Sequence, residues 1–204
     1  MNRARKIVAA VALAFATSCA SDSNISPLMD QVGKDQAAPV PLRGQAVVVF
    51  MRPTGDSPDV QSTVYDLQKD GDHFVGVVSD GTRVHWVTWA GSHLFMVIGE
   101  NADFMNAELA EGKVYYARVV PRSGALKSRF SIKPVRRAQI GTPEWTTWDD
   151  TSSVLLRCSS RCEEWVDNNV NSVVGKRNKY MAKWTKKTEG KRRRAGLLAE
   201  DGYP

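Results

Sequence analysis

The chain has 204 residues, of which 28 are lysine or arginine and 22 are aspartate or glutamate, so its formal net charge is +6. This length suits one domain with a core of ordinary size and a short appendage. The first apolar run, Ile7 to Phe15, is about half of the ~20 residues that a membrane-spanning helix needs, and no later stretch is long enough. The composition therefore excludes anchoring by a transmembrane helix.

Residues 1–18 have the order of a secretory signal peptide: a basic start, a short apolar run and then small residues just before Cys19. This order resembles the lipobox of bacterial lipoproteins. The resemblance implies that Cys19 becomes the first residue and carries a diacylglyceryl thioether and an amide-linked acyl chain, which suffice for stable attachment to a membrane. Ala20, in place of the aspartate associated with inner-membrane retention in proteobacteria, implies the outer membrane, facing the periplasm. The alternative is an ordinary signal peptide in which Cys19 falls by chance.

Charge is distributed unevenly along the remainder of the chain. Residues 1–18 contain three cations and no acid, so the processed chain would carry 25 cations against 22 acids, or +3. Residues 19–150 hold 13 basic and 16 acidic side chains, whereas residues 151–204 hold 12 and 6. This asymmetry predicts that the C-terminal segment has a partner of its own.

The segment 19–43, after the acylated cysteine, is predicted to be a flexible tether. It is rich in Ser, Asp, Gln and Ala, has prolines at 27, 39 and 41, and shows no apolar periodicity. A random coil of this length would hold the domain about 25–30 Å from the membrane.

Residues 44–140 are predicted to form an antiparallel β-sandwich of seven to eight short strands. Turn pairs such as Asp70-Gly71, Asp80-Gly81 and Glu111-Gly112 recur about every ten residues, which is typical of such folds. The runs 47–50 and 94–98 are apolar at every position, so both of their faces should be covered. The expected strands are 46–52, 62–69, 73–79, 83–89, 93–98, 104–110, 114–121 and 127–133.

Five short motifs lie in this region: Val47 to Pro53, Tyr65-Asp66, Phe74 to Val77, Ala90 to His93 and Glu111 to Tyr116. Together they resemble an uncharacterised β-sandwich domain family of bacterial lipoproteins, similar to PEGA and transthyretin-like domains. The resemblance covers about residues 44–122 and implies a transthyretin-like fold without an assigned activity. Ala90 departs from the family pattern, which commonly has a proline before the glycine.

Residues 150–189 are predicted to form an amphipathic helix that packs on the sandwich, because apolar residues recur there at three- and four-residue steps. Asp150, Thr151 and Ser152 are the expected N-cap residues. The last segment, 190–204, is predicted to be a basic disordered tail.

Cys158 and Cys162 are the only cysteines left if Cys19 is acylated. On a continuous helix their Cα atoms would be about 6 Å apart, within the range of a disulfide but with poorly directed Cβ atoms. A disulfide, two buried thiols and a redox or metal pair remain alternatives at this point.

The cations near the C-terminus are a possible polyanion-binding set. Nucleic acid is not expected in the envelope, so the candidate partners are anionic lipid, an acidic cell-wall polymer or an envelope protein. A solvated helix end is the simpler alternative. The residues are Lys183, Lys186, Lys187, Lys191, Arg192, Arg193 and Arg194.

Four tryptophans near the predicted sandwich are possible glycan-binding residues, because indole rings stack on sugars, although core packing explains them more simply. They are Trp86, Trp89, Trp145 and Trp148. The histidines at 73, 85 and 93 are expected to be isolated surface or turn residues, with 85 and 93 on opposite faces of a hairpin turning at Ala90-Gly91.

No motif for a nucleophile, a metal or a cofactor is present, so we predict a protein that is not an enzyme and holds no metal or cofactor. The sequence favours a lipid-anchored envelope scaffold or binding module whose basic C-terminal helix contacts anionic components. A glycan- or peptidoglycan-binding sandwich is the alternative.

Overall fold

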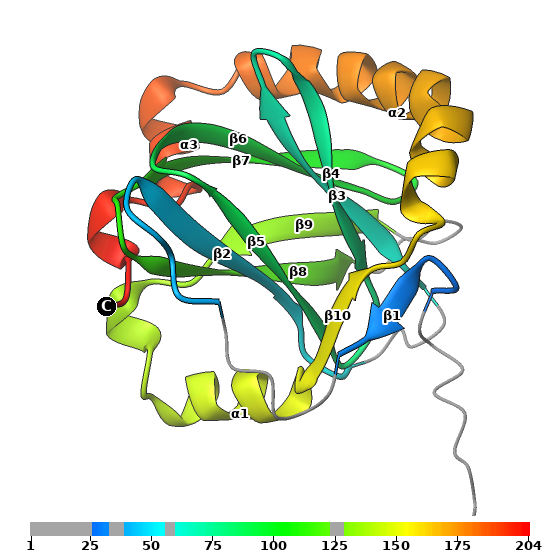
Figure 1. Cartoon of the computed structure of the whole chain (residues 1–204). Helices are drawn as coiled ribbons and strands as arrows, with labels where there is room; N and C mark the ends of the chain where they lie inside the picture. Colours follow the sequence, from blue (N-terminus) through cyan, green and yellow to red (C-terminus); the bar gives the residue numbers. More distant parts are fainter. Residues whose placement is uncertain (1–25, 33–38, 56–59, 123–128) are drawn as a thin grey trace, which may run out of the picture.

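Two β-sheets pack face to face with helices outside them, as Figure 1 shows for this computed structural model. The structure describes residues 26–32, 39–55, 60–122 and 129–204. Within these ranges the chain is mainly β, with ten strands and three α-helices, one of them long and near the C-terminus. The prediction of a mainly β, sandwich-like domain with a C-terminal helix is confirmed at this level.

The first sheet has six strands in the order β1-β10-β5-β2-β8-β9. The pairs β10–β5 and β2–β8 are parallel, whereas the other three pairs are antiparallel. The sheet is therefore mixed, which corrects the prediction of a wholly antiparallel sandwich. Its strands are β1 (Met29–Gln31), β2 (Gln45–Arg52), β5 (Thr82–Trp89), β8 (Val114–Arg122), β9 (Arg129–Pro134) and β10 (Val154–Cys158).

The second sheet has four antiparallel strands in the order β4-β3-β6-β7. All eight predicted strands correspond to β2 through β9, but β1 and β10 make ten, not seven to eight. The two additional strands are only three and five residues long. Segments this short show no periodicity that would distinguish β1 from a linker or β10 from the start of a helix. The strands of this sheet are β3 (Ser62–Gln68), β4 (Gly71–Val78), β6 (Gly91–Ile98) and β7 (Ala102–Leu109).

The prediction of a hairpin at Ala90-Gly91 is wrong, because the two strands that flank this turn lie in different sheets. Strand β5 pairs with β2 and β10 in the first sheet, and β6 pairs with β3 and β7 in the second. The chain therefore passes from one sheet to the other at this turn, where Gly91 has a φ of 133° that favours glycine. His85 and His93 consequently belong to different sheets.

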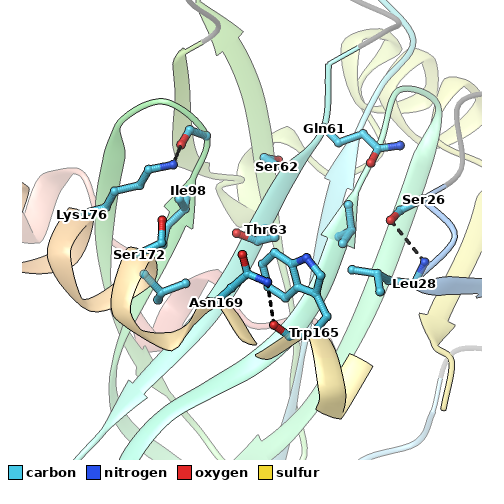
Figure 2. A pocket seen from close by; sticks show the side chains of 13 residues that line it. Ser26, Leu28, Gln61, Ser62, Thr63, Ile98, Trp165, Asn169, Ser172 and Lys176 are labelled. Atoms are coloured by element: carbon cyan, nitrogen blue, oxygen red, sulfur yellow. Dashed lines mark hydrogen bonds between the residues drawn. The ribbon is translucent and has the colours of Figure 1, made fainter. Parts of the chain in front are cut away.

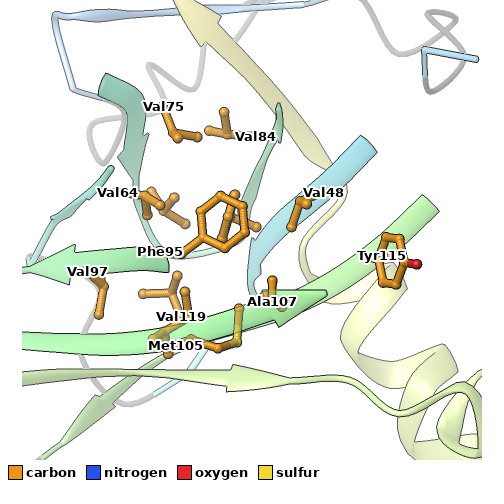
Figure 3. Close-up of a cluster of buried hydrophobic side chains, with 14 of the residues drawn as sticks. Val48, Val64, Val75, Val84, Phe95, Val97, Met105, Ala107, Tyr115 and Val119 are labelled. Carbon is orange, nitrogen blue, oxygen red and sulfur yellow. The ribbon is translucent and has the colours of Figure 1, made fainter. Parts of the chain in front are cut away.

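The main core fills the space between the sheets. Figure 3 shows Val48 of β2, Val64 of β3 and Phe95 of β6 among the side chains that meet there. Phe50 packs edge-to-face on Phe95, with 5.0 Å between ring centroids.

Helices cover both outer faces, as the uniformly apolar runs predicted. The helix α2 (Cys162–Thr185) lies over the second sheet, where its Val173 and Trp184 are buried with Tyr65 and Phe104. The helix α1 (Pro143–Thr151) lies on the first sheet, and Figure 1 shows it on the opposite side of the molecule from α2. The predicted N-cap residues for the long helix instead lie at the end of α1. The cap of α1 is Thr142, whose hydroxyl accepts from the backbone N–H of Trp145.

The segment 19–43 is not wholly a tether. Its residues 26–32 fold onto the domain: β1 pairs with β10, and Met29 is buried in the main core. A single apolar side chain in a polar context carries no periodic signal, which is why this strand was not predicted. Cys19 and the predicted signal peptide, residues 1–18, lie outside the described residues.

The predicted boundaries of the C-terminal part are also corrected. The segment 150–189 contains β10 before α2, and 190–204 is not disordered. It forms α3 (Glu189–Arg194) and a final 3₁₀ turn (Ala199–Asp201), with Leu197 buried and Tyr203 bonded to Val114 through both backbone groups. Arg136 anchors this end through its ion pair with Asp201 at 2.6 Å.

Candidate functional site

The four candidate glycan-binding tryptophans do not form one surface. Trp86 is directed into the sandwich, where its Nε1 donates to Asp66 at 3.0 Å. Trp148 is buried and Arg118 lies over its ring at 3.7 Å, while Trp145 packs edge-to-face on Tyr116. Only Trp89 of the four is largely exposed, at 66%. Three of the four rings thus have structural partners.

The two C-terminal cysteines are joined by a disulfide. Cys158 ends β10 and Cys162 begins α2, so the pair bridges a tight turn, with 5.8 Å between the Cα atoms, rather than two positions on one helix. The disulfide fixes the direction in which α2 leaves the first sheet.

The seven predicted polyanion-binding residues separate into different surroundings. Lys183 and Lys187 line one hollow, whereas Arg193 lines another with Glu108 and Glu189. Arg192 donates to the carbonyls of Thr185 and Lys187 at 3.0 and 2.9 Å, so it caps the end of α2. The remaining three, Lys186, Lys191 and Arg194, are exposed and line neither hollow.

The hollow at the end of α2 gathers cations from two distant parts of the chain. Arg122 ends β8 and Arg129 begins β9, and both line a cavity of ≈290 Å³ together with Lys183 and Lys187. Asp103 is the one carboxylate in the lining, so the ionised side chains sum to +3. We call this site the basic hollow; its lining residues are Asn101, Ala102, Asp103, Phe104, Arg122, Arg129, Tyr180, Lys183, Trp184 and Lys187.

Aromatic rings line the helix side of the basic hollow. Nζ of Lys187 lies 4.2 Å from the ring centroid of Trp184, and Nζ of Lys183 lies 5.7 Å from that of Tyr180. Contact with the negative face of an aromatic ring holds an ammonium group near the wall without neutralising its charge. The carbonyl end of α2 would repel an anion, but the guanidinium of Arg192 bonded to it offsets that field.

On the strand side of the basic hollow, one amide and one carboxylate side chain form hydrogen bonds with the backbone of β9. Asn101 exchanges two hydrogen bonds with the backbone of Phe130, at 2.9 and 3.1 Å, next to Arg129. Asp103 accepts from the backbone N–H of Ile132 at 3.3 Å. These hydrogen bonds position the start of β9. The carboxylate of Asp103 therefore has a structural role. The arrangement can bind an anion with several oxygens, because arginine and lysine together supply many donors.

Sequence reasoning found Lys183 and Lys187 but missed Arg122 and Arg129. These arginines flank the segment 123–128 between two strands, so in the sequence they look like ordinary loop-end cations. Only the pairing of β8 with β9 and the packing of α2 beside β7 bring them to the helix end.

A second hollow, of ≈310 Å³, lies between the first half of α2 and the ends of β3 and β6, and Figure 2 shows it from close by. Its lining mixes hydroxyl and amide groups with aliphatic side chains, one indole and one ammonium group. We call it the polar hollow; its residues include Ser62, Thr63, Trp165, Asn169, Ser172 and Lys176.

A buried ion pair between Asp66 and His93 lies within the second sheet, and Trp86 of the first sheet bonds to its carboxylate. Asp66 of β3 has no exposed surface, and its carboxylate accepts from His93 Nδ1 at 3.0 Å, Trp86 Nε1 at 3.0 Å and Gln68 Nε2 at 2.8 Å. His93 Nε2 lies 2.8 Å from the carbonyl oxygen of Trp89, so both ring nitrogens face acceptors, an arrangement that favours the imidazolium form. The prediction of three isolated surface or turn histidines is therefore wrong for His93.

Each partner of this pair has a shifted pKa. Burial alone would raise the pKa of Asp66, but the hydrogen bonds from His93 and Trp86 and the charge of His93 together lower it. Burial alone would lower the pKa of His93, but the hydrogen bond and the charge of Asp66 raise it. With both ring nitrogens engaged, His93 is placed to stabilise the fold rather than to transfer protons.

No family model matches this chain, and the comparison with curated proteins found no match. Among the described residues, no helix is long and apolar enough to span a membrane, and no cluster of three or more His, Cys, Asp or Glu side chains is arranged to hold a metal ion.

Proposed function

We propose that this protein is a lipid-anchored bacterial envelope component that binds phosphate esters in the basic hollow and is not an enzyme. The observation that carries the proposal is the convergence of Arg122 and Arg129 with Lys183 and Lys187 around one cavity. Cations that repel one another are gathered only at a cost, and a multivalent anion offsets that cost.

Phosphate chemistry fits the basic hollow better than a lone carboxylate. A phosphate ester presents several oxygens and can accept bidentate bonds from an arginine while a lysine contacts another oxygen. The two aromatic side chains would pack against the apolar part of an esterified ligand, such as a glycerol backbone.

The envelope location rests on the lipobox-like residues up to Cys19, with Ala20 favouring the outer membrane. If Cys19 is acylated, six residues lie between it and Ser26, so the seven Cα-to-Cα steps that join them can reach at most ~25 Å. Anionic lipid headgroups and phosphate-containing wall polymers would both be accessible at that range. A transthyretin-like origin for the sandwich remains part of this proposal.

A charge-removal pair tests the proposal, using the mature chain with Cys19→Ser so that acylation does not mask binding. The hollow variant is K183Q/K187Q, and the matched control is K186Q/K191Q, which removes the same charge from neighbouring exposed positions. At about 1 kcal/mol per cation near an anionic surface, the hollow variant should lose about thirtyfold in affinity. The control should stay within about twofold.

Two probes distinguish the source of the phosphate. Glycerol 3-phosphate measures binding of a soluble ester, and vesicles with phosphatidylglycerol measure binding of a lipid surface. Binding of both indicates a general phosphate site, whereas binding of vesicles alone assigns the site to headgroups. An equal loss in the hollow variant and the control, or no binding of either probe at low salt, would refute the proposal.

A further inference from the structure

The polar hollow is a separate cavity with its own chemistry, and it shares no lining residue with the basic hollow. Lys176 is the one charged residue among those that line it. Around that ammonium group are hydroxyl and amide side chains, and Leu28 and Ile98 supply apolar surface. The mixture is polar enough to order a hydrated ligand and apolar enough to pack against its carbon skeleton.

The polar groups are held in place by bonds to the backbone. Lys176 Nζ donates to the carbonyl of Gly99 at 2.7 Å, which uses one of its three N–H donors and fixes the ammonium at the edge of the cavity. Asn169 Nδ2 donates to the carbonyl of Trp165 at 2.8 Å. Figure 2 shows the amide oxygen of Asn169 on the other side, pointing toward Thr63.

Trp165 gives the cavity an aromatic wall. Its indole is half-buried and leans on Phe74, with 5.5 Å between ring centroids. Figure 2 shows the ring extending into the polar hollow between Asn169 and Leu28. If Trp165 served only to pack on Phe74, it would not need hydroxyl and amide side chains around it.

We propose that the polar hollow binds a saccharide ring that bears a carboxylate. The indole would stack on the C–H face of the ring, the hydroxyl and amide groups of Thr63, Asn169 and Ser172 would bind its hydroxyls, and Lys176 would bind the carboxylate. The volume of ≈310 Å³ lies at the small end of ligand pockets, which suits one or two sugar units rather than a long segment.

The test is a ¹⁵N-detected NMR titration of the mature chain carrying Cys19→Ser. The probes are D-glucuronate and D-glucose, which differ at the carboxylate. We expect glucuronate to shift the indole N–H signal of Trp165, assigned with Trp165→Phe, together with amides of 169–176. Glucose should produce the same pattern with about tenfold weaker affinity, because it lacks the charged hydrogen bond.

Charge variants on the same helix locate the carboxylate. Lys176→Gln should lower the affinity for glucuronate about tenfold and leave that for glucose unchanged, whereas Lys179→Gln, which is exposed and outside the cavity, should change neither. Three outcomes would overturn the proposal: no shift with either sugar at tens of millimolar, an unchanged glucuronate affinity in Lys176→Gln, or equal losses in the two lysine variants. Binding in the basic hollow is measured separately, so its failure would leave this result intact.

Discussion

Removal of the negative charge from Asp66 should destabilise the protein in a pH-dependent way. Asp66→Asn keeps the size of the side chain, and its carbonyl oxygen can still accept from Trp86 and Gln68. The variant removes the ion-pair partner of His93, whose side chain is only 6% exposed and so gains little compensation from solvent. Removal of one partner of a buried pair costs about 3–5 kcal/mol, a large fraction of the stability of an ordinary domain.

The pH dependence follows from the direction of each pKa shift. In the wild type, the lowered pKa of Asp66 stabilises the fold above the ordinary value of 3.8, and the raised pKa of His93 does so below the ordinary value of 6.5. The pair is thus fully effective between these two pH values. In the variant, a buried His93 without a counterion stays neutral, so its folded pKa falls below 6.5. Stability is then lost on acidification, adding about 2 kcal/mol to the cost between pH 6.5 and pH 5.

Urea unfolding monitored by circular dichroism at pH 7.5 and pH 5 measures both effects. The matched control is Asp70→Asn, which breaks the surface pair of Asp70 with His73, 3.0 Å apart, and should leave stability unchanged. A cost for Asp66→Asn below about 1 kcal/mol at both pH values, or one that shrinks at pH 5, would refute the assignment of a buried ion pair.

Two further substitutions test separate parts of the fold. Burial, and to a smaller extent the charge of Arg83, lowers the pKa of His85 to about 4. The neutral form of His85 therefore stabilises the fold above the ordinary pKa of 6.5, and this contribution is lost as the pH falls toward 4. His85→Gln should therefore reduce the acid-induced loss of stability by up to about 3 kcal/mol, measured by urea unfolding at pH 7 and pH 4.5; an identical pH profile would contradict this. Leu197→Ala should cost about 2–5 kcal/mol, because Leu197 is 1% exposed, and a cost below about 0.5 kcal/mol would show that the C-terminal end is not docked.

The strands were predictable because turn residues separate apolar segments at regular intervals. Asp70-Gly71 and Asp80-Gly81 mark two turns correctly, and the uniformly apolar run of β2 correctly predicted cover on both faces. Which strands pair was not predictable, because the local pattern at Ala90-Gly91 is the same for a hairpin and for a passage between sheets. The parallel pairs arise from such passages.

In the candidate sites, too, the features visible in the local sequence were predictable and those that depend on long-range packing were not. The basic residues of α2 were visible as a charge run, but Arg122 and Arg129 joined them only through long-range packing. Asp66 and His93 are 27 residues apart, and each is unremarkable in its local sequence. The docked C-terminal end was missed because its charged composition outweighs the one buried leucine at 197, whose contacts with β7 lie far away in the sequence.

The most direct test of the basic hollow is a ¹⁵N NMR titration of the mature chain carrying Cys19→Ser with glycerol 3-phosphate. We expect signals from the starts of β7 and β9 and from the end of α2, including the indole of Trp184, to shift together with a single dissociation constant. Signals from α3, whose cations lie outside the cavity, should not follow that curve. Shifts spread evenly over exposed lysines and arginines, or confined to α2, would contradict a site built from both parts of the chain.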